Sequence, residues 1–295
     1  MDAIGQIASR LDALAAHVRA APPSAALRDA FAALRLDEIV GSVTLAGATL
    51  DAVEVRALLE RGRALGGHRF DDYLLTRDYA AAAAWASAHA RRRAAVSLDD
   101  LRTLHRLAVS GLADDGGAWR TENLPALPDG TVPPPHWMVA FETESFIGRV
   151  ALGEGDPAPL ALARAIARIA RLRPFRVGNG RVARLLANLL AYRRGLPPLV
   201  LDARARRTYP AALQAGLAGD VVPLARLAGA SLARGLERLR DAAEAPSDLR
   251  PLSDFAEGGR PERLYKAAQR GRLRVVRKRG KILTTEAWVR AYGAR

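Results

Sequence analysis

The chain of 295 residues contains no cysteine and only three lysines, and aromatic residues make up only 5% of it. The absence of cysteine excludes disulfide bonds and thiolate metal sites, which fits a cytoplasmic protein. No apolar run reaches the roughly 18 residues that a membrane span needs, so no membrane partner is expected. The N-terminus lacks a basic start followed by an apolar segment, so no signal peptide is expected either.

What the chain does contain is 49% hydrophobic residues and a net charge of +14. A chain of this length can bury a substantial core as one large helical domain with a small appendage. The positive charge is concentrated at the C-terminus: residues 260–295 hold twelve Lys or Arg, including all three lysines, against two Glu. Concentrated basic charge on a short segment indicates a polyanionic partner.

The spacing of apolar residues predicts a mainly α fold. We expect N-terminal helices in residues 1–35, a helical domain in 36–242, a linker in 243–250 and a second domain in 251–295. Ser24 is placed to cap the helix that follows it, and Ser97-x-x-Asp100 has the pattern of a capping box. Further helices are expected over residues 51–62, 72–92, 98–111, 157–172, 182–194, 211–218 and 222–242.

The most informative stretch lies between two of these helices, at residues 173–184. Pro174 ends the first helix, because the residue before a proline is pushed out of the α region. Gly178-Asn179-Gly180 tolerates positive φ immediately before the next helix begins. Such a turn points backbone N–H groups inward at the positive end of a helix dipole, and Arg181 and Arg184 add two cations. This arrangement predicts a phosphate-binding loop.

The motif Pro-Phe-x-x-Gly-Asn-Gly-Arg-x-x-Arg in this stretch resembles the signature of Fic-domain (Fido) proteins, which typically transfer AMP from ATP to a protein hydroxyl. The resemblance implies a Fic-type helical bundle with a small β-hairpin flap. The family pattern has a His before the Pro-Phe and an acidic residue before the Gly-Asn-Gly, where this chain has Arg173 and Val177.

These two departures define what chemistry we expect to remain. Arg173 occupies the position of the catalytic His but cannot act as a base, because a guanidinium stays protonated at any working pH. Val177 has no oxygen to bind a metal, so we assign no metal ligand and do not expect the protein to hold Mg²⁺. Base catalysis alone contributes roughly 10²–10⁴-fold in rate, so standard AMP transfer should be severely impaired.

A second part of the resemblance concerns regulation. In many Fic proteins a helix carries Ser/Thr-x-x-x-Glu, whose Glu reaches the second motif arginine and blocks productive ATP binding. Ser42-x-x-x-Ala46-Gly47 resembles that pattern with Ala in place of Glu. The resemblance therefore implies that Arg184 has lost its inhibitory partner. The alternative is an Ala/Gly-rich helix and turn without any regulatory role.

Three other segments are also similar to the family. Leu-His-x-x-Leu-like helix residues around His105 precede a Gly-x-x-Arg turn, and we expect His105 to be a helix residue rather than a ligand. Residues 123–150 contain Asp129-Gly130, a hairpin signal, at the place where the family has its flap; a plain Pro-rich loop would look similar. Tyr209 corresponds to a residue beside the adenine, although Ala205 departs from that motif and core packing of Tyr209 is the stronger alternative.

The C-terminal segment resembles an excisionase/MerR-type winged helix-turn-helix domain. Its pattern predicts two short helices, two strands around Lys278-Arg279-Gly280, and a closing helix. A recognition helix would expose Arg260, Arg263, Lys266 and Arg270, and a wing of Arg277, Lys278, Arg279 and Lys281 would touch phosphates. The alternative is a solvated basic tail that folds onto the main domain.

Three functions remain open from the sequence. The first is an impaired Fic protein that binds ATP, another nucleotide or a phosphorylated small molecule, and DNA, as a transcription regulator. Its ligand would contact Gly178, Asn179, Gly180, Arg181, Arg184 and Tyr209, and a homodimer is one expected form. The second is an active adenylyltransferase or other nucleotidyl or phosphoryl transferase with a non-standard base, drawn from His136, Asp129, Glu122 or Glu142. The third is a partner-binding Fic relative with an empty pocket.

Overall fold

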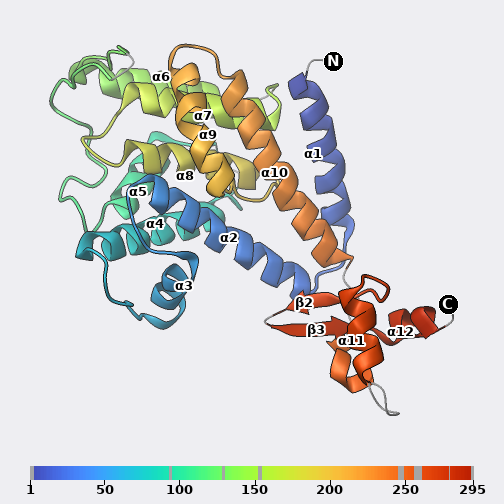
Figure 1. The fold of residues 1–295 in the computed structure, drawn as a ribbon. Coiled ribbons are helices and arrows are strands. Elements are labelled where there is room, and N and C mark those ends of the chain that lie inside the picture. Colours follow the sequence, from blue (N-terminus) through green and yellow to red (C-terminus); the bar gives the residue numbers. More distant parts are fainter. Residues whose placement is uncertain are drawn as a thin grey trace.

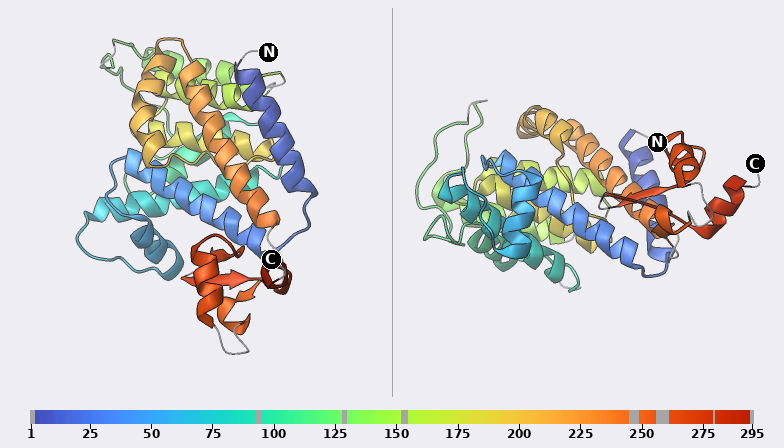
Figure 2. Two further views of the ribbon diagram at one scale, coloured as in Figure 1. Left: turned by 45° about the vertical axis from the view of Figure 1, so that its right-hand side comes forward. Right: turned by 60° about the horizontal axis from the view of Figure 1, so that its bottom comes forward.

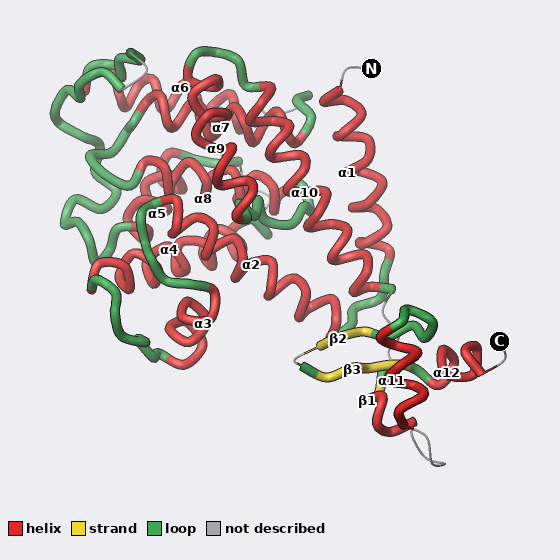
Figure 3. The backbone as a smooth tube through the Cα atoms, viewed as in Figure 1, coloured by secondary structure: helices red, strands yellow, loops and turns green. Residues whose placement is uncertain are grey.

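A computed structural model of the protein describes residues 3–92, 95–127, 130–151, 155–244, 249–255, 261–278 and 280–293. The described chain is mainly helical, as predicted (Figure 1, Figure 3). The elements in chain order are α1 (Ala3–Ala20), α2 (Ala25–Leu45), α3 (Ala52–Arg61), α4 (Phe70–His89), α5 (Leu98–Ala108), the 3₁₀ helix η1 (His136–Met138), α6 (Val139–Ala151), α7 (Ala158–Leu172), α8 (Asn179–Arg193), α9 (Ala203–Leu217), α10 (Val222–Ala243), β1 (Arg250–Pro251), η2 (Leu252–Phe255), α11 (Pro261–Gln269), β2 (Val276–Lys278), β3 (Lys281–Thr284) and α12 (Glu286–Gly293).

Polar side chains fix several helix starts. Ser24 Oγ accepts a hydrogen bond from the Leu27 backbone N–H at the start of α2, which confirms the predicted cap. Ser97 and Asp100 form the predicted capping box at the start of α5. Each such cap satisfies backbone N–H groups that have no partner within the helix and stabilises it by about 1 kcal/mol.

The central helix of the bundle is α8, which packs against α7, α4 and α5. Every residue from 181 to 191 is buried, including Leu185, Leu186 and Leu189. The helix begins at Asn179, three residues earlier than predicted, because Gly178 takes a left-handed conformation (φ 76°) and serves as its N-cap. The loop that precedes α8 is therefore anchored to the most buried element of the domain.

The N-terminal helices belong to the same core as the rest of the bundle. A boundary between residues 35 and 36 falls inside α2, which runs unbroken to Leu45. Helix α1 lies along α10 in all views (Figure 1, Figure 2) and buries Ile4, Leu11 and Ala15. A Cβ at Gly229 of α10 would lie only 2.5 Å from Ile7 Cγ2, so the two helices approach closely.

The expected β-hairpin flap is not formed by the described residues between 120 and 151. The Leu127 N–H donates to Thr131 O at 2.8 Å, which closes a turn without strands. Residues 136–151 are helical instead, as η1 and α6. The reason is their spacing: Val139, Thr143 and Phe146 recur every three or four residues and are buried on one helical face. Pro128 and Asp129 lie outside the described residues.

The sheet of the described chain belongs to the C-terminal segment. Its strand order is β1-β3-β2, all antiparallel, with Val276 opposite Leu283 and Arg250 opposite Thr284. This segment has a small apolar core of its own around Leu252 and Leu273, and it lies beside the ends of α2 and α10 (Figure 1). The predicted strand pair and closing helix are confirmed. None of the described helices is long and apolar enough to cross a membrane.

Candidate functional site

The loop between α7 and α8 starts with an unusual backbone conformation at Arg173. This residue has φ 44° and ψ 60°, and it is the non-glycine residue with positive φ in the described chain. Left-handed backbone is disfavoured for residues with a Cβ, so neighbouring contacts must hold it. Its own N–H donates to Ile169 O at 2.9 Å and ends α7.

Arg120 supplies much of that support. Its Nε donates to Arg173 O at 2.9 Å, and its backbone N–H donates to Pro174 O at 3.0 Å. The same guanidinium donates through Nη1 to Glu122 O at 2.7 Å and through Nη2 to Pro134 O. Burial and the nearby Arg173 lower the pKa of Arg120. Arg120, the last residue of the Gly-x-x-Arg turn, thus ties three loop segments together through backbone carbonyls.

Phe175 packs against a ring on each of two neighbouring segments. It stacks on His105 with ring centroids 3.8 Å apart and on Trp119 with centroids 5.1 Å apart. His105 Nδ1 accepts from the Gly117 N–H at 2.9 Å, so its Nε2 carries the proton and donates to Val177 O at 3.1 Å. Desolvation lowers the pKa of His105 to about 4, so it is neutral near pH 7. His105 is a packed residue that fixes the loop.

The Asn179 side chain is used within the loop. Its Oδ1 accepts from the Phe175 N–H at 3.0 Å and its Nδ2 donates to Phe175 O at 2.7 Å. The side chain was expected to contact a phosphate, but both of its polar atoms hold the loop's backbone. Gly178 must be glycine, because a Cβ there would lie 2.9 Å from Val109 Cγ1 at positive φ.

The two motif arginines lie beside the two loop glycines. A Cβ at Gly178 would lie 3.4 Å from Arg181 Nη2, and a Cβ at Gly180 would lie 3.3 Å from Arg184 Nη1. Both guanidiniums are buried, and Arg181 also donates to Ala108 O. Burial, followed by repulsion from Arg184, lowers the pKa of Arg181. A Cβ at either glycine would crowd a guanidinium, so glycine at both positions allows two cations to lie close to the positive end of α8.

Arg184 is bonded to Ser42 of α2, and no acidic side chain takes the place of the inhibitory Glu at Ala46. Its Nε donates to Ser42 Oγ at 2.5 Å and its Nη2 to Ser42 O at 2.9 Å. It also hydrogen-bonds Tyr209, which is 4% exposed and part of the core. The burial of Tyr209 agrees with core packing, the stronger of the two alternatives for this residue. Ala46 follows Ser42 by one helical turn, at the exposed end of α2.

A buried carboxyl group behind Arg184 was missed by the sequence reasoning. Glu38 Oε1 accepts from Tyr79 OH at 2.5 Å and from Asn188 Nδ2 at 2.8 Å. Desolvation raises the pKa of Glu38 to about 7, against the opposing effects of Tyr79, Arg184 and Asn188. The sequence did contain a signal for the position of Glu38: it lies four residues before Ser42 and therefore on the same face of α2.

The candidate replacement bases have different surroundings in the structure. Glu142 forms an ion pair with Arg168 of α7. The backbone N–H of His136 donates to Asn123 Oδ1 at 2.9 Å, and its Nδ1 lies 3.2 Å from the same oxygen. Glu122 is exposed, and Asp129 lies outside the described residues. The donor set at the loop does not fit a protein-held metal, since Val177 has no side-chain oxygen and Asp115 is bonded to Arg176 at 2.8 Å.

Five of the eight proposed DNA-contacting residues can be described, and all five are exposed. Arg263, Lys266 and Arg270 are exposed on or just after α11, at spacings of three and four residues. Arg277 and Lys281 are exposed on the β2–β3 hairpin. Arg260, Arg279 and the side chain of Lys278 lie outside the described residues.

Comparison with known proteins finds similarity to one family. Residues 95–191, which span α5 to α8, match the model of the Fic/DOC family. This part of the chain therefore resembles a Fic domain. It is 29% identical over 212 residues to protein adenylyltransferase fic-1 of Caenorhabditis elegans, covering 70% of this chain and 41% of that protein. It is also 29% identical over 223 residues to protein adenylyltransferase Fic of Drosophila erecta, covering 74% and 44%. The chain spans less than half the length of these relatives.

Solved structures share the fold. Residues 134–508 of C. elegans Fic-1 match with a TM-score of 0.71 at 24% identity, covering 80% of this chain and 71% of that one. A Fic domain containing signaling protein from Bacteroides thetaiotaomicron matches with a TM-score of 0.71 at 21% identity, covering 83% and 98%. A Fic family protein from Desulfovibrio desulfuricans matches with a TM-score of 0.60 at 18% identity, covering 97% and 96%.

Proposed function

We propose that this Fic-domain protein binds a nucleotide, such as ATP, or another phosphorylated ligand at residues 178–184, without standard AMP-transfer chemistry. One observation carries the proposal: Arg181 Nη2 and Arg184 Nη1 lie beside the side-chain-free positions Gly178 and Gly180 at the start of α8. An anion there would relieve the repulsion between two buried cations and accept from first-turn N–H groups.

The same loop explains why binding is proposed without turnover. Arg173 stands where the family has its base, and Val177 stands where it has its acid. Arg173 lies half-buried beside the loop and adds a third positive charge. Charge of this sign favours an anionic ligand but offers no acceptor for a hydroxyl proton.

Calorimetric titration of the full chain with ATP tests this proposal. We expect measurable binding that weakens when Gly180→Val fills the space next to Arg184. Gly148→Val is the matched control, because nothing lies within 4 Å of a Cβ at Gly148 on α6. Absence of heat and of a thermal shift with ATP, ADP and phosphate esters would contradict the proposal.

A transferase with a non-standard base is the second candidate, because the relatives are named protein adenylyltransferases. Its base would come from His136, Glu122, Glu142 or Asp129. Transfer of label from α-³²P-ATP to any protein of a cell lysate by the unmodified chain, abolished by His136→Gln or Glu122→Gln, would support it over binding alone.

For the C-terminal segment we propose DNA binding, and with it a role in transcription regulation. The exposed basic face of α11 and the basic hairpin support this. Lys266→Ala combined with Arg270→Ala should weaken a DNA complex in a mobility-shift assay, and added salt should weaken it steeply. Arg56→Ala with Arg91→Ala removes the same charge from the helical domain and should leave the complex intact. A chain that ignores DNA at low salt would rule this role out.

A further inference from the structure

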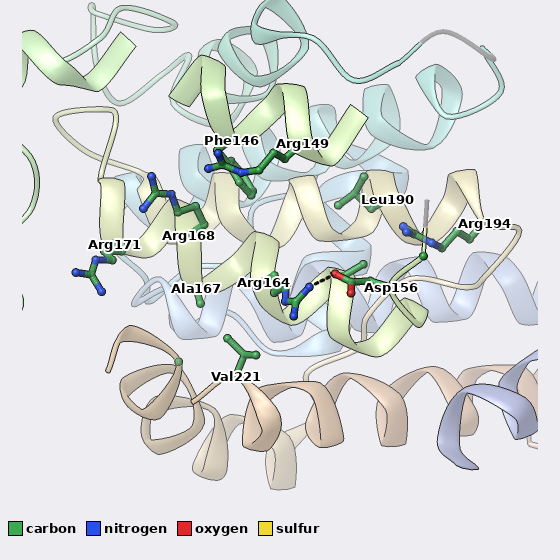
Figure 4. A pocket seen from close by; sticks show the side chains of 13 residues that line it. Phe146, Arg149, Asp156, Arg164, Ala167, Arg168, Arg171, Leu190, Arg194 and Val221 are labelled. Carbon is green, nitrogen blue, oxygen red and sulfur yellow. Dashed lines mark hydrogen bonds and ion pairs between the residues drawn. The ribbon is translucent and has the colours of Figure 1, made fainter. Parts of the chain in front are cut away.

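A cavity separate from the loop is rich in arginine. It has a volume of about 740 Å³ and lies between α6, α7 and the ends of α8 and α9. The described residues of its lining include one acidic residue, Asp156, and five arginines: Arg149, Arg164, Arg168, Arg171 and Arg194. Figure 4 shows the guanidiniums of Arg171, Arg168 and Arg164 spaced along α7, with Asp156 and Arg194 beyond them.

The three α7 arginines share a face because they are spaced four and three residues apart. The rise of an α-helix separates Arg164 from Arg171 by about 10 Å along the axis. Positive charge spread over this distance fits a ligand with several anionic groups better than a single small ion.

Nearby acidic groups compensate only part of this charge. Arg164 pairs with Asp156, and Arg168 pairs with Glu142. The Nε of Arg168 is buried and has no hydrogen-bond partner among the described residues. Arg171 Nη1 donates to a backbone carbonyl, Leu217 O, at 3.2 Å, and Arg149 Nη1 donates to the Ser145 hydroxyl at 2.9 Å. Within the part of the chain that the structure describes, these two guanidiniums are bonded to neutral partners, which do not compensate their charge.

The rest of the lining is apolar: Phe146, Ala161, Ala167, Leu190 and Val221. Arginines that are merely solvated on a surface would not surround apolar side chains in this way. A cavity of this size suits a small organic molecule. The combination indicates a ligand with a charged end and an apolar or aromatic body.

From these features we infer that the cavity is a second binding site, for a multiply charged organic phosphate. Its phosphate oxygens would accept from Arg149, Arg164 and Arg171, and its apolar part would lie against Phe146 and Val221. The site is distinct from the loop, since none of residues 173–184 lines the cavity.

Calorimetry on the full chain with ADP as the probe tests the inference. We expect ADP to bind more tightly than pyrophosphate, which lacks the ring, or adenosine, which lacks the charge. Arg149→Ala with Arg164→Ala should weaken ADP binding by about a hundredfold, since each lost charged hydrogen bond typically costs about tenfold. The control pair Arg56→Ala and Arg91→Ala, outside the cavity, should leave it unchanged.

A loop variant separates this site from the one proposed above. Arg173→Ala should leave cavity binding intact, and if the loop also binds ADP, only that second component should change. Should the Arg149/Arg164 variant unfold, Arg149→Gln with Arg171→Gln serves in its place. The inference is overturned if the wild-type chain does not bind ADP, if all binding depends on Arg173, or if cavity and control variants bind alike. Binding of a nucleic acid in place of ADP at the same arginines would overturn it as well.

Discussion

Glu38 is surrounded by groups from three helices: Tyr79 on α4, Asn188 and Arg184 on α8, and Arg35 on its own helix. Its pKa is raised from 4.5 to about 7 in the folded protein. The neutral form is therefore favoured by folding, and the associated stability is full below pH 4.5 and is lost as pH rises through 7. A shift of this size corresponds to about 3 kcal/mol at most.

Glu38→Gln should abolish this pH dependence, because the amide keeps an acceptor for Tyr79 and does not ionise. Urea unfolding between pH 4.5 and 8 should show the variant gaining stability relative to the wild type as pH rises. Glu60→Gln, on the exposed side of α3, should run parallel to the wild type. A constant difference between Glu38→Gln and wild type across this range would show that Glu38 does not titrate there.

The stability that His105 contributes depends on pH in the opposite direction to that of Glu38. Its pKa is lowered from 6.5 to about 4, so its contribution to stability is present above pH 6.5 and is lost as pH falls through 4. His105→Leu should retain stacking volume but leave the Gly117 N–H and Val177 O without their partner, which costs about 2–5 kcal/mol. Denaturant unfolding at pH 7.5 measures this against His17→Leu, an exposed control. Equal stabilities of the two variants would remove His105 from its role in fixing the loop.

At the scale of elements, α2 is held against the segment before α9 by a close approach at Gly41. A Cβ there would lie 2.4 Å from Leu201 O, a backbone atom that cannot rotate away. Gly41→Ala should therefore destabilise the protein by about 1–3 kcal/mol and displace Ser42 from Arg184. Gly148→Ala on α6 meets nothing within 4 Å and should instead be neutral or stabilise by about 0.5–1 kcal/mol. Thermal unfolding of both variants checks the pair, and similar melting temperatures would contradict the close approach.

The elements also show which features a sequence can predict. Local signals succeeded: Ser24 and the Ser97–Asp100 box cap their helices as predicted. The described residues around the predicted flap form a turn without strands, as in the alternative of a plain loop, and residues 136–151 are helical; Asp129 lies outside the described residues. A turn dipeptide indicates only that the chain reverses, and it does not specify strands on either side.

Sequence reasoning was also limited for the loop between α7 and α8. Its motif, its glycines and the helix start could be read from the sequence. The family resemblance brought the helix of Ser42 next to Arg184, but the two hydrogen bonds from Arg184 to Ser42 could be seen only in the folded chain. Glu38 was missed for the same reason: a carboxyl on an amphipathic helix looks exposed until a neighbouring helix covers it.

At the scale of the whole molecule, positive charge occurs at three separate places: the loop, the arginine cavity and the basic C-terminal segment. The helical domain and the C-terminal segment each have their own apolar core. Charge removed from the C-terminal segment should therefore leave the helical domain folded, and charge removed from the helical domain should leave the C-terminal segment folded. This separation is what allows the loop, cavity and DNA proposals to be tested by independent variants.

The central claim is that the Fic loop keeps its phosphate-binding frame without the groups for AMP transfer. Transfer of label from α-³²P-ATP to protein, compared between the wild type and Arg173→His/Val177→Glu, tests it most directly. The account predicts no labelling by the wild type and clear labelling by the double variant, because base and acid return to an intact frame. Labelling by the wild type as strong as by the double variant would contradict it.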